Sequence, residues 1–544
     1  MRCVRRSICP VRFVSMAAVM GGLLAAAGCL TVAAAAGPEN VPPETPAAVG
    51  TQADGTTGGT PLEPAATDAT LVQAAVTPGL RVRVKLDVSG ELLAPAGPEA
   101  PPVRESVAMT ARFDFEETTA ETAPARPAVV RRSYRDATAS MRFGDVSTTS
   151  TLAADARRLL VVRQGTTPVP YLADGFLSGE EADLLETPFD SLLLDDLLPK
   201  EPLPIGQTWT VPADVTAGLL AIDTVESGGL EARVEEVSDS RGKVTFSGII
   251  DGAVDGVPTH LTVEGSFTVA ARDVPADDDS TASEAPRQEL HGRVLQASAV
   301  IRERRQASHV APGFEVEARL LVARTELAAG QELTEESGQH SDGAGGTLTG
   351  SQNAAAAGEL SRRRGDGGPG RVWYRDPSGC FDLVHDSRWR RVEEGEHGLV
   401  MRLVDRGALV GQCSITSLPQ AAASPLPTRE DVQRDMERSL TGQAGRSDAP
   451  EQSDRADGLR VVRLVSSGTA GRLPFRWIHY VLAAQDGSRV SVTFMCEESM
   501  LPRFGDADRP LIEGLLLRKP QPASTNDQSD ATATLPAAAG QQTR

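Results

Sequence analysis

The sequence is poor in lysine, asparagine and aromatic side chains. Its 544 residues include 4 tyrosines and 4 tryptophans, and aromatic residues make up only 4%. The lysines are Lys85, Lys200, Lys243 and Lys519. Arginine therefore carries nearly all of the positive charge. Its planar fork suits carboxylate or phosphate recognition, whereas the scattered positions favour the simpler explanation of a GC-rich coding sequence.

Positive charge is also scarce beside negative charge. Lysine and arginine total 54 against 74 for aspartate and glutamate, which gives a formal net charge of -20. Such a chain repels nucleic acids and anionic surfaces, so we expect no nucleic-acid partner. The basic run at 362–364 lies in a glycine-rich stretch without aromatic residues, and we expect it to be solvated.

Motifs of catalysis and cofactor binding are missing. The sequence has no Walker loop, no H-E-x-x-H and no G-x-S-x-G. Gly365, Gly367 and Gly370 match G-x-G-x-x-G in letters, but no predicted strand precedes them and Pro369 interrupts the motif. Neither C-x-x-C nor zinc-type Cys/His spacing occurs. We predict a protein that is not an enzyme and that binds no cofactor and no metal.

Cysteines are absent from the middle of the chain, between Cys29 and Cys380. Three lie within the first 29 residues, and Cys380, Cys413 and Cys496 lie in the C-terminal part. Alternation places Cys413 and Cys496 on apolar faces of predicted strands, but it does not show whether those strands are neighbours. We expect buried free thiols, with a Cys413–Cys496 disulfide as the disfavoured alternative and Cys380 more exposed.

One apolar run approaches the length of a membrane span. Residues 13–36 carry no charge and follow four arginines, as in a secretory signal. We predict a signal peptide at 1–36 that is cleaved after Ala36. The alternatives are lipidation at Cys29, which follows Ala27 and Gly28, and an uncleaved anchor. The expected location is exported: periplasmic, associated with the cell envelope, or secreted. Membrane contact is expected only through this segment or through lipid at Cys29.

Composition divides the rest of the chain into modules and linkers. Stretches rich in Pro, Gly, Ala, Thr and acidic residues show no apolar periodicity, so they cannot bury enough surface to offset the entropy of ordering. The predicted division is a disordered linker at 37–77, a β-rich domain at 78–328, a second linker at 329–370, a second domain at 371–519 and a disordered tail at 520–544.

The first module alternates apolar and polar residues as strands with one buried face do. From Leu80 to Val88 every second residue is apolar, and similar runs begin at Val107, Leu261 and Phe314. Dipeptides such as Asp-Gly at 255–256 supply hairpin turns. The prediction is a mostly antiparallel β module with a single helix.

That helix is expected from Thr187 to Pro199, with Phe189, Leu192 and Leu193 on its apolar face. Acidic residues cluster in and before it: Glu180, Glu181, Asp183, Glu186, Asp190, Asp195 and Asp196. Paired carboxylates could serve acid/base hydrolysis or hold a cation, but a solvated helix face is the preferred interpretation.

The second module contains both the two-residue apolar period of strands and the 3.6-residue apolar period of helices. Strands are expected at 381–385, 399–404, 412–418, 459–465, 475–484 and 489–496. Helices are expected after Thr428 and around Leu511 to Leu516. This order predicts an α+β sandwich, an antiparallel sheet flanked by helices. His385 and His479 are in step with apolar neighbours, which indicates hydrogen-bonded core histidines rather than catalytic bases.

Four segments of this module carry a family resemblance: CFDLVHDSRW at 380–389, TREDVQRDMERSL at 428–440, RWIHYVLA at 476–483 and DRPLIEGLLLRKP at 508–520. They resemble the PsbP/Mog-type α/β/α sandwich, although Asp386 and Ser387 stand where that family commonly has proline. The resemblance implies binding and assembly roles and no shared catalytic residues. The first module is more loosely similar to the curved sheets of periplasmic lipoprotein carriers.

These observations favour an exported, non-enzymatic binding or scaffold protein of the cell envelope. The partner expected is an unknown protein or an apolar ligand. The first alternative is a carrier that holds lipid or another apolar ligand on the concave face of the N-terminal sheet. The second is a hydrolase that uses acidic residues.

Overall fold

The structure is a computed structural model that describes residues 69–73, 79–94, 103–123, 126–201, 203–204, 206–238, 241–273, 288–306, 312–327, 368–395, 398–419, 426–439, 444–470 and 473–518. The predicted signal peptide with Cys29, the basic run at 362–364, the G-x-G-x-x-G letters up to Gly367 and the C-terminal tail lie outside these residues.

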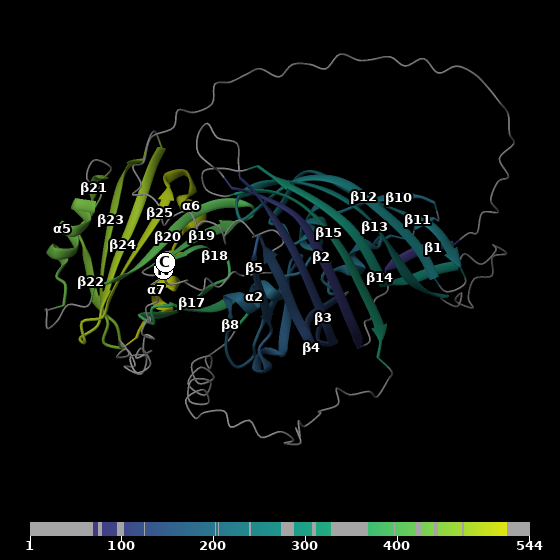
Figure 1. Ribbon diagram of the computed structural model, residues 1–544, viewed down its shortest axis with the longest axis horizontal. Coiled ribbons are helices and arrows are strands. Elements are labelled where there is room, and N and C mark those ends of the chain that lie inside the picture. Colours follow the sequence, from purple (N-terminus) through teal and green to yellow (C-terminus); the bar gives the residue numbers. More distant parts are fainter. Residues whose placement is uncertain are drawn as a thin grey trace, which may run out of the picture.

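A strongly curved sheet of 14 strands forms most of the first module (Figure 1). Its main path is β10-β11-β12-β13-β14-β15-β2-β3-β4-β6-β7, and sequential neighbours along it are antiparallel. The strands are β1 (Ala69–Gln73), β2 (Leu80–Ala94), β3 (Val103–Ala123), β4 (Arg126–Phe143), β5 (Val146–Thr151), β6 (Arg158–Gln164), β7 (Thr167–Tyr171), β9 (Leu203–Pro204), β10 (Thr208–Val211), β11 (Thr224–Ser238), β12 (Arg241–Val254), β13 (Val257–Asp273), β14 (Gln288–Arg305) and β15 (Gly313–Glu326).

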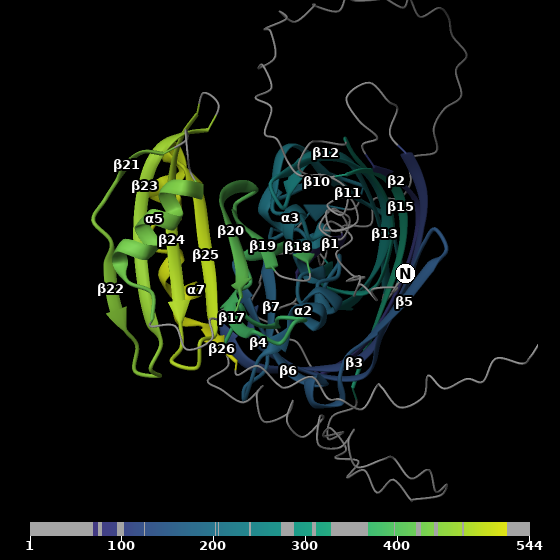
Figure 2. The same ribbon diagram turned by 60° about the vertical axis from the view of Figure 1, so that its left-hand side comes forward.

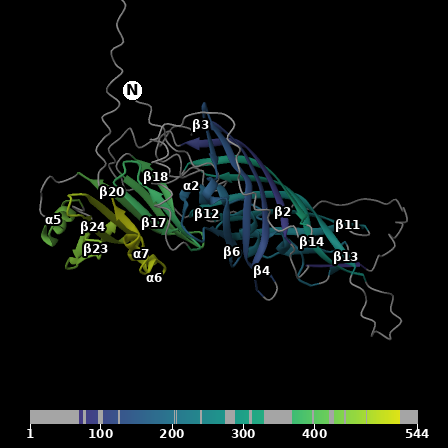
Figure 3. The same ribbon diagram turned by 90° about the horizontal axis from the view of Figure 1, so that it is seen from below.

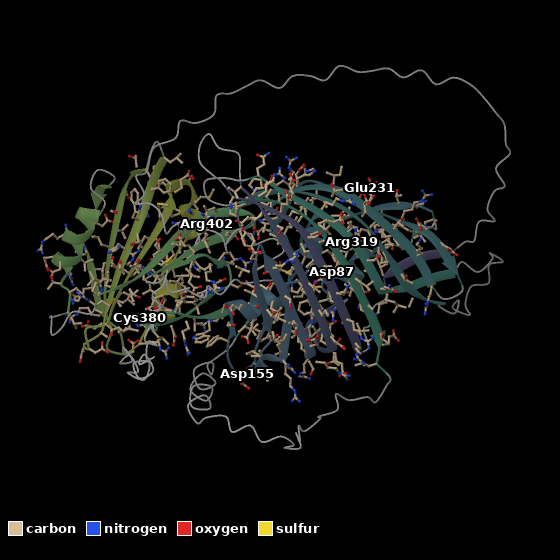
Figure 4. All side chains as sticks on the ribbon, in the orientation of Figure 1. Asp87, Asp155, Glu231, Arg319, Cys380 and Arg402 are labelled. Atoms are coloured by element: carbon tan, nitrogen blue, oxygen red, sulfur yellow. The ribbon has the colours of Figure 1, made fainter. Side chains whose placement is uncertain are left out.

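Alternation explains which face of this sheet is buried. Along β2, the side chains from Leu80 to Val88 at every second position are buried. The outer face carries charged residues, among them Asp87, Glu231 and Arg319, which Figure 4 labels. The expected mostly antiparallel sheet is therefore present. Strand β1, by contrast, falls inside the predicted linker at 37–77 and pairs parallel to β14.

The concave face is filled by the chain's own segment between β7 and β11. It contains β8 (Leu177–Ser178), α2 (Gly179–Leu185), the 3-10 turn η3 (Leu194–Leu197) and α3 (Ala213–Leu220). Figure 2 shows the sheet curving around α2 and α3. The Phe189 ring lies 5.7 Å from that of Phe246 on β12, and Phe189 is fully buried.

The expected helix from Thr187 to Pro199 is wrong. The helix of this region ends at Leu185, and it begins earlier, where Ser178 and Glu181 form a capping box. Beyond it the backbone runs in turns: Phe189 has a φ of 55°, and its N–H donates to the carbonyl of Leu219 at 2.6 Å. These turns are held by ion pairs to the sheet, described below, and not by the hydrogen bonds of a helix.

The second module has a sheet of eight strands in the order β18-β19-β20-β25-β24-β23-β21, with β22 paired to β23. Its strands are β18 (Trp389–Gly395), β19 (Gly398–Asp405), β20 (Ala408–Leu418), β21 (Ala444–Ser447), β22 (Glu451–Asp454), β23 (Arg460–Ala470), β24 (Leu473–Ala483) and β25 (Arg489–Glu497). Figure 3 shows this module from below, at one end of the long curved sheet.

A second, four-stranded sheet has the order β26-β17-β16-β8. It consists of β16 (Arg371–Arg375), β17 (Phe381–Asp386), β26 (Leu515–Leu517) and β8 of the first module. The short helices are α5 (Arg429–Ser439), α6 (Leu501–Phe504) and α7 (Asp508–Glu513), with 3-10 turns η2 (Ala154–Ala156) and η4 (Glu498–Met500).

The predicted C-terminal α+β sandwich is wrong, because the fold is mostly β. The core of the eight-stranded sheet is closed by the small sheet together with the one-turn helices α6 and α7. The terminal helix ends at Glu513, and the following Gly514 lies against β17, where a Cβ would be 1.9 Å from the Val384 carbonyl oxygen. The leucines after it then form strand β26. On the other face, Val432 of α5 is buried against Val462 and Val481.

Candidate functional site at the seam between the modules

Three of the clustered aspartates lie in buried ion pairs rather than on a solvated helix face. Arg132 on β4 donates from both Nη atoms to Asp190 at 2.8 and 2.6 Å. Its Nε donates to Glu117 at 2.8 Å, and Ser191 donates to the same carboxylate at 2.6 Å. Arg132 and both carboxylates are at most 7% exposed. These pairs satisfy each other's hydrogen bonds within the interior.

The other two aspartates are held in the same way from different strands. Asp195 accepts from Arg324 on β15 at 2.8 and 3.0 Å. Asp196 accepts from Arg163 on β6. The segment is thus fixed to three separate strands of the curved sheet by arginine forks. The preferred solvated-face interpretation was wrong here, because alternation and helical periodicity do not reveal which arginines lie across the concave face.

The two modules meet along a surface that we call the seam. Its first component is a parallel strand pairing in which β16 aligns Val372 with Leu177 and Trp373 with Ser178 of β8. The guanidinium of Arg371 lies 5.5 Å from the centre of the Phe176 ring. A strand of the first module therefore completes a sheet of the second.

The second component of the seam is formed by two hairpin turns, each of which lies against a strand of the other module. Asp255 and Gly256 join β12 to β13 with φ of 50° and 75°, and Arg406 and Gly407 join β19 to β20 with φ of 47° and 70°. Positive φ at both central residues is the type I′ turn of tight hairpins. A Cβ at Gly407 would lie 2.5 Å from Cγ2 of Thr224, so this turn fits tightly against the first module.

Charges form the third component. Arg390 on β18 lies 3.7 Å from Asp255 and 4.0 Å from Glu186, both in the first module. Arg402 on β19, labelled in Figure 4, lies on the side of the second module that faces the first. Burial lowers the pKa of Arg402, and the charge of Asp255 opposes that shift. The seam therefore sets carboxylates of the first module against arginines of the second.

A carboxylate pair also belongs to this seam. Tyr374 donates to Glu394 at 3.0 Å, and Arg391 lies 3.4 Å from the other oxygen of Glu394. Glu180 at the start of α2 is half-buried, and burial raises its pKa; Arg391 lowers it, whereas Glu394 and Asp183 raise it further. Burial also raises the pKa of Tyr374. Sequence reasoning noted Glu180 but missed Tyr374, Arg391 and Glu394, because no local pattern places them beside α2.

The two histidines differ in their surroundings. His385 on β17 is buried, and its Nδ1 is 2.9 Å from the Asp386 carbonyl oxygen. Burial lowers its pKa to about 4. His479 on β24 is half-exposed, with Nδ1 2.7 Å from the Thr493 hydroxyl. Both histidines are hydrogen-bonded, as predicted, although His479 is not fully in the core.

Cys413 and Cys496 are buried and Cys380 is half-buried, and all three are free thiols. Strands β20 and β25 are neighbours, and Cys413 lies opposite Phe494, two residues from Cys496. Such a diagonal pair on adjacent strands is about 7–8 Å apart, beyond the ~7 Å that a disulfide spans. Burial raises the pKa of Cys413, and it raises the pKa of Cys496 to about 11. Both thiols therefore stay protonated near neutral pH.

Neither a metal site nor a membrane-spanning helix occurs in the part of the chain that the structure describes. No group of three or more His, Cys, Asp or Glu side chains there could hold a metal ion. None of the described helices is long and apolar enough to cross a membrane.

No family model matches the chain, and no curated protein matches it. Solved structures share parts of its arrangement. Cyanobacterial PsbP from Synechocystis is 15% identical, over 27% of this chain and 93% of that chain, with a TM-score of 0.23. A protein of unknown function from Pseudomonas aeruginosa is 15% identical, over 28% of this chain and 99% of that chain, with a TM-score of 0.20.

A porin, Salmonella typhi OmpF, is 8% identical over 77% of this chain and 97% of that chain, with a TM-score of 0.11. With TM-scores this far below 0.5, none of the three similarities defines a function or a location. The similarity to PsbP covers a fragment of the chain.

Proposed function

We propose that this chain is an exported, non-enzymatic binding or scaffold protein of the cell envelope. The observation that supports it most is the state of the clustered aspartates. Asp190, Asp195 and Asp196, which a hydrolase would need free, are each engaged by an arginine of the curved sheet. They act as fixed anchors for the segment inside the sheet, and the outer surfaces of both modules are left for recognition.

The carrier alternative places an apolar ligand on the concave face of the first module. Leucines from the segment at 184–198 are fully or almost fully buried against that face. A ligand there would have to displace them. The binding or scaffold function needs no such rearrangement, so we place it first.

The PsbP-like relationship of residues 371–519 and the signal peptide at 1–36 belong to the same proposal. Fusion of residues 1–36 to a reporter that is active only after export tests the signal. Mass spectrometry of the mature N-terminus then separates the three outcomes: cleavage after Ala36, lipid on Cys29, or an intact N-terminus.

Photo-crosslinking in the native envelope tests the binding function. A photoreactive residue is placed at exposed apolar positions, Ile249 and Leu321 on the curved sheet and Leu473 and Leu516 on the second module. We expect a defined adduct with one protein from one module, lost when that protein is deleted. Crosslinks only to lipid, with lipid retained in native mass spectrometry, would favour the carrier. Hydrolytic turnover that Glu180→Gln abolishes would favour the enzyme.

A further inference from the structure

The two modules bury their apolar residues in separate cores. The larger hydrophobic cluster of the described residues runs from Leu80 to Val322, and the second runs from Tyr374 to Leu515. Neither cluster spans the seam. Interfaces between domains that lack a shared apolar core resemble those of separable complexes rather than of permanent ones.

The seam is crossed by a two-residue strand pairing with the Arg371–Phe176 contact, by two hairpin turns that fit closely against strands of the opposite module, and by charge. The groups of the first module are acidic: Glu180 and Glu186 at the two ends of α2, and Asp255 in its hairpin turn. The charged groups of the second module are the arginines of β18 and β19, together with Glu394, which acts on Glu180 as a like charge. Arg390 reaches two of these carboxylates at once, at 3.7 and 4.0 Å. Opposite charges at such distances attract, and dissolved salt screens them.

We propose that the second module is a docked partner of the first, held on its acidic surface by the arginines of β18 and β19, and that this docking is reversible and does not depend on the connecting chain. The inference concerns the chain's own architecture and is independent of the proposed function. It predicts that two fragments stay together after the connection is cut, and that salt separates them.

The experiment uses the full chain with a specific protease site inserted between Gly345 and Gly346. After complete cleavage, the fragments are run on a sizing column with light scattering at 50 mM and at 1 M NaCl. We expect one complex at low salt and two separate species at high salt, because the Debye length falls to about 3 Å at 1 M. Fragments that separate at 50 mM would show that the modules are not docked. A complex that survives 1 M NaCl would show that charge does not hold it.

A charge reversal tests the named arginine. Arg390→Glu places like charges across the seam and should weaken fragment association at 50 mM NaCl by about tenfold or more. The matched control is Arg388→Glu, because Arg388 pairs with Asp386 of its own module at 2.9 Å. It should leave association unchanged. Adding Glu186→Arg to Arg390→Glu should restore part of the loss. Equal effects of the two single reversals would overturn the assignment.

The turn contact is tested by two glycines with similar backbones. Gly407 and Gly458 have φ of 70° and 84°, so alanine strains both turns alike. Only Gly407 faces the other module, whereas a Cβ at Gly458 meets nothing within 4 Å. Gly407→Ala should weaken association severalfold and Gly458→Ala should not. Melting curves of each cleaved fragment separate a docking defect from a folding defect; a Gly407→Ala variant that associates normally contradicts the proposed fit.

Discussion

The interiors of the two modules are built on different principles. Inside the curved sheet, Arg132, Arg163 and Arg324 bind aspartates of an irregular segment. The second module instead closes around aromatic rings, with Trp389 lying 5.6 Å from Phe494 and 6.4 Å from Phe504. Buried ion pairs specify one geometry because any other leaves a charge unpaired, whereas apolar contacts tolerate repacking. We therefore expect the first interior to be the more sensitive to loss of a charged partner and the second to be the more tolerant of apolar repacking.

The sharpest test of this comparison is to remove one buried arginine. Arg132→Met should destabilise the first module by about 3–5 kcal/mol, because Glu117 and Asp190 are left buried without their partner. Chemical denaturation of the variant and the wild type measures the difference. The control is Arg135→Met on the same strand, since Arg135 is 54% exposed where it pairs with Glu116. Exposed pairs contribute about 0–1 kcal/mol. Similar losses for both variants would contradict the buried-pair account.

The next largest effect concerns the one buried histidine of the small sheet. Burial lowers the pKa of His385 to about 4 from its usual 6.5, so the unfolded chain takes up a proton that the folded chain refuses. Stability is therefore complete above pH 6.5 and falls as the pH drops toward 4, by roughly 3 kcal/mol in all.

His385→Asn removes this titration and keeps a side-chain N–H that can donate to the Asp386 carbonyl. Denaturant unfolding at pH 7 and pH 4.5 should show a smaller acid loss in the variant than in the wild type. His479→Asn, on the half-exposed histidine of β24, is the comparison variant, because it replaces a histidine outside the small sheet. An acid loss that His385→Asn leaves unchanged would assign it to other groups.

A smaller effect is expected from reshaping the aromatic core. Phe494 is fully buried on β25, and Phe494→Leu keeps most of its volume and its apolar character. The expected cost is about 1–1.5 kcal/mol, well below that of Arg132→Met. The free energies of unfolding of Phe494→Leu and Arg132→Met, measured in the same denaturant, show directly which interior is more sensitive to one substitution. A cost for Phe494→Leu as large as that for Arg132→Met would reverse the ranking of the two interiors.

The smallest expected effect is a difference in reactivity among the thiols, which involves no loss of stability. Of Cys380, Cys413 and Cys496, only Cys380 should react with a thiol reagent in the native mature protein, because Cys413 and Cys496 are buried and have raised pKa values. After denaturation without a reductant, all three should react within minutes at pH 8. A peptide that joins Cys413 to Cys496 by a disulfide would contradict both the free thiols and the estimated spacing.

The sequence predicted local structure where one rule decided it. From Leu80 to Val88 every second residue of β2 is buried as alternation required, and Asp255 and Gly256 form the expected hairpin turn. Thr428 caps α5 as predicted, accepting from the Asp431 N–H at 3.2 Å. The prediction failed where a local residue pattern competed with contacts to residues far away in the chain. The leucines of the segment after Pro188 suggested a helix, but its aspartates are bound to strands elsewhere in the chain.

The contacts at the seam could not be predicted from local sequence patterns either. Its strand pairing joins Leu177 to Val372, and its ion pairs join Arg390 to residues of two elements in the first module. No spacing or period connects such residues, although each of them had a sensible local interpretation. Only the docked arrangement of the two modules brings them within a few ångströms of each other.

The sequence alone therefore determined the long alternating strands, such as β2, and the tight turns, because backbone geometry and burial act on residues that are close in the chain. The tertiary structure decided which charges became anchors and where the modules meet. Asp190 and Arg132 are 58 positions apart, and Asp195 and Arg324 are 129 apart. Over such separations, the curvature of the sheet and the order of its strands select the partner of each side chain.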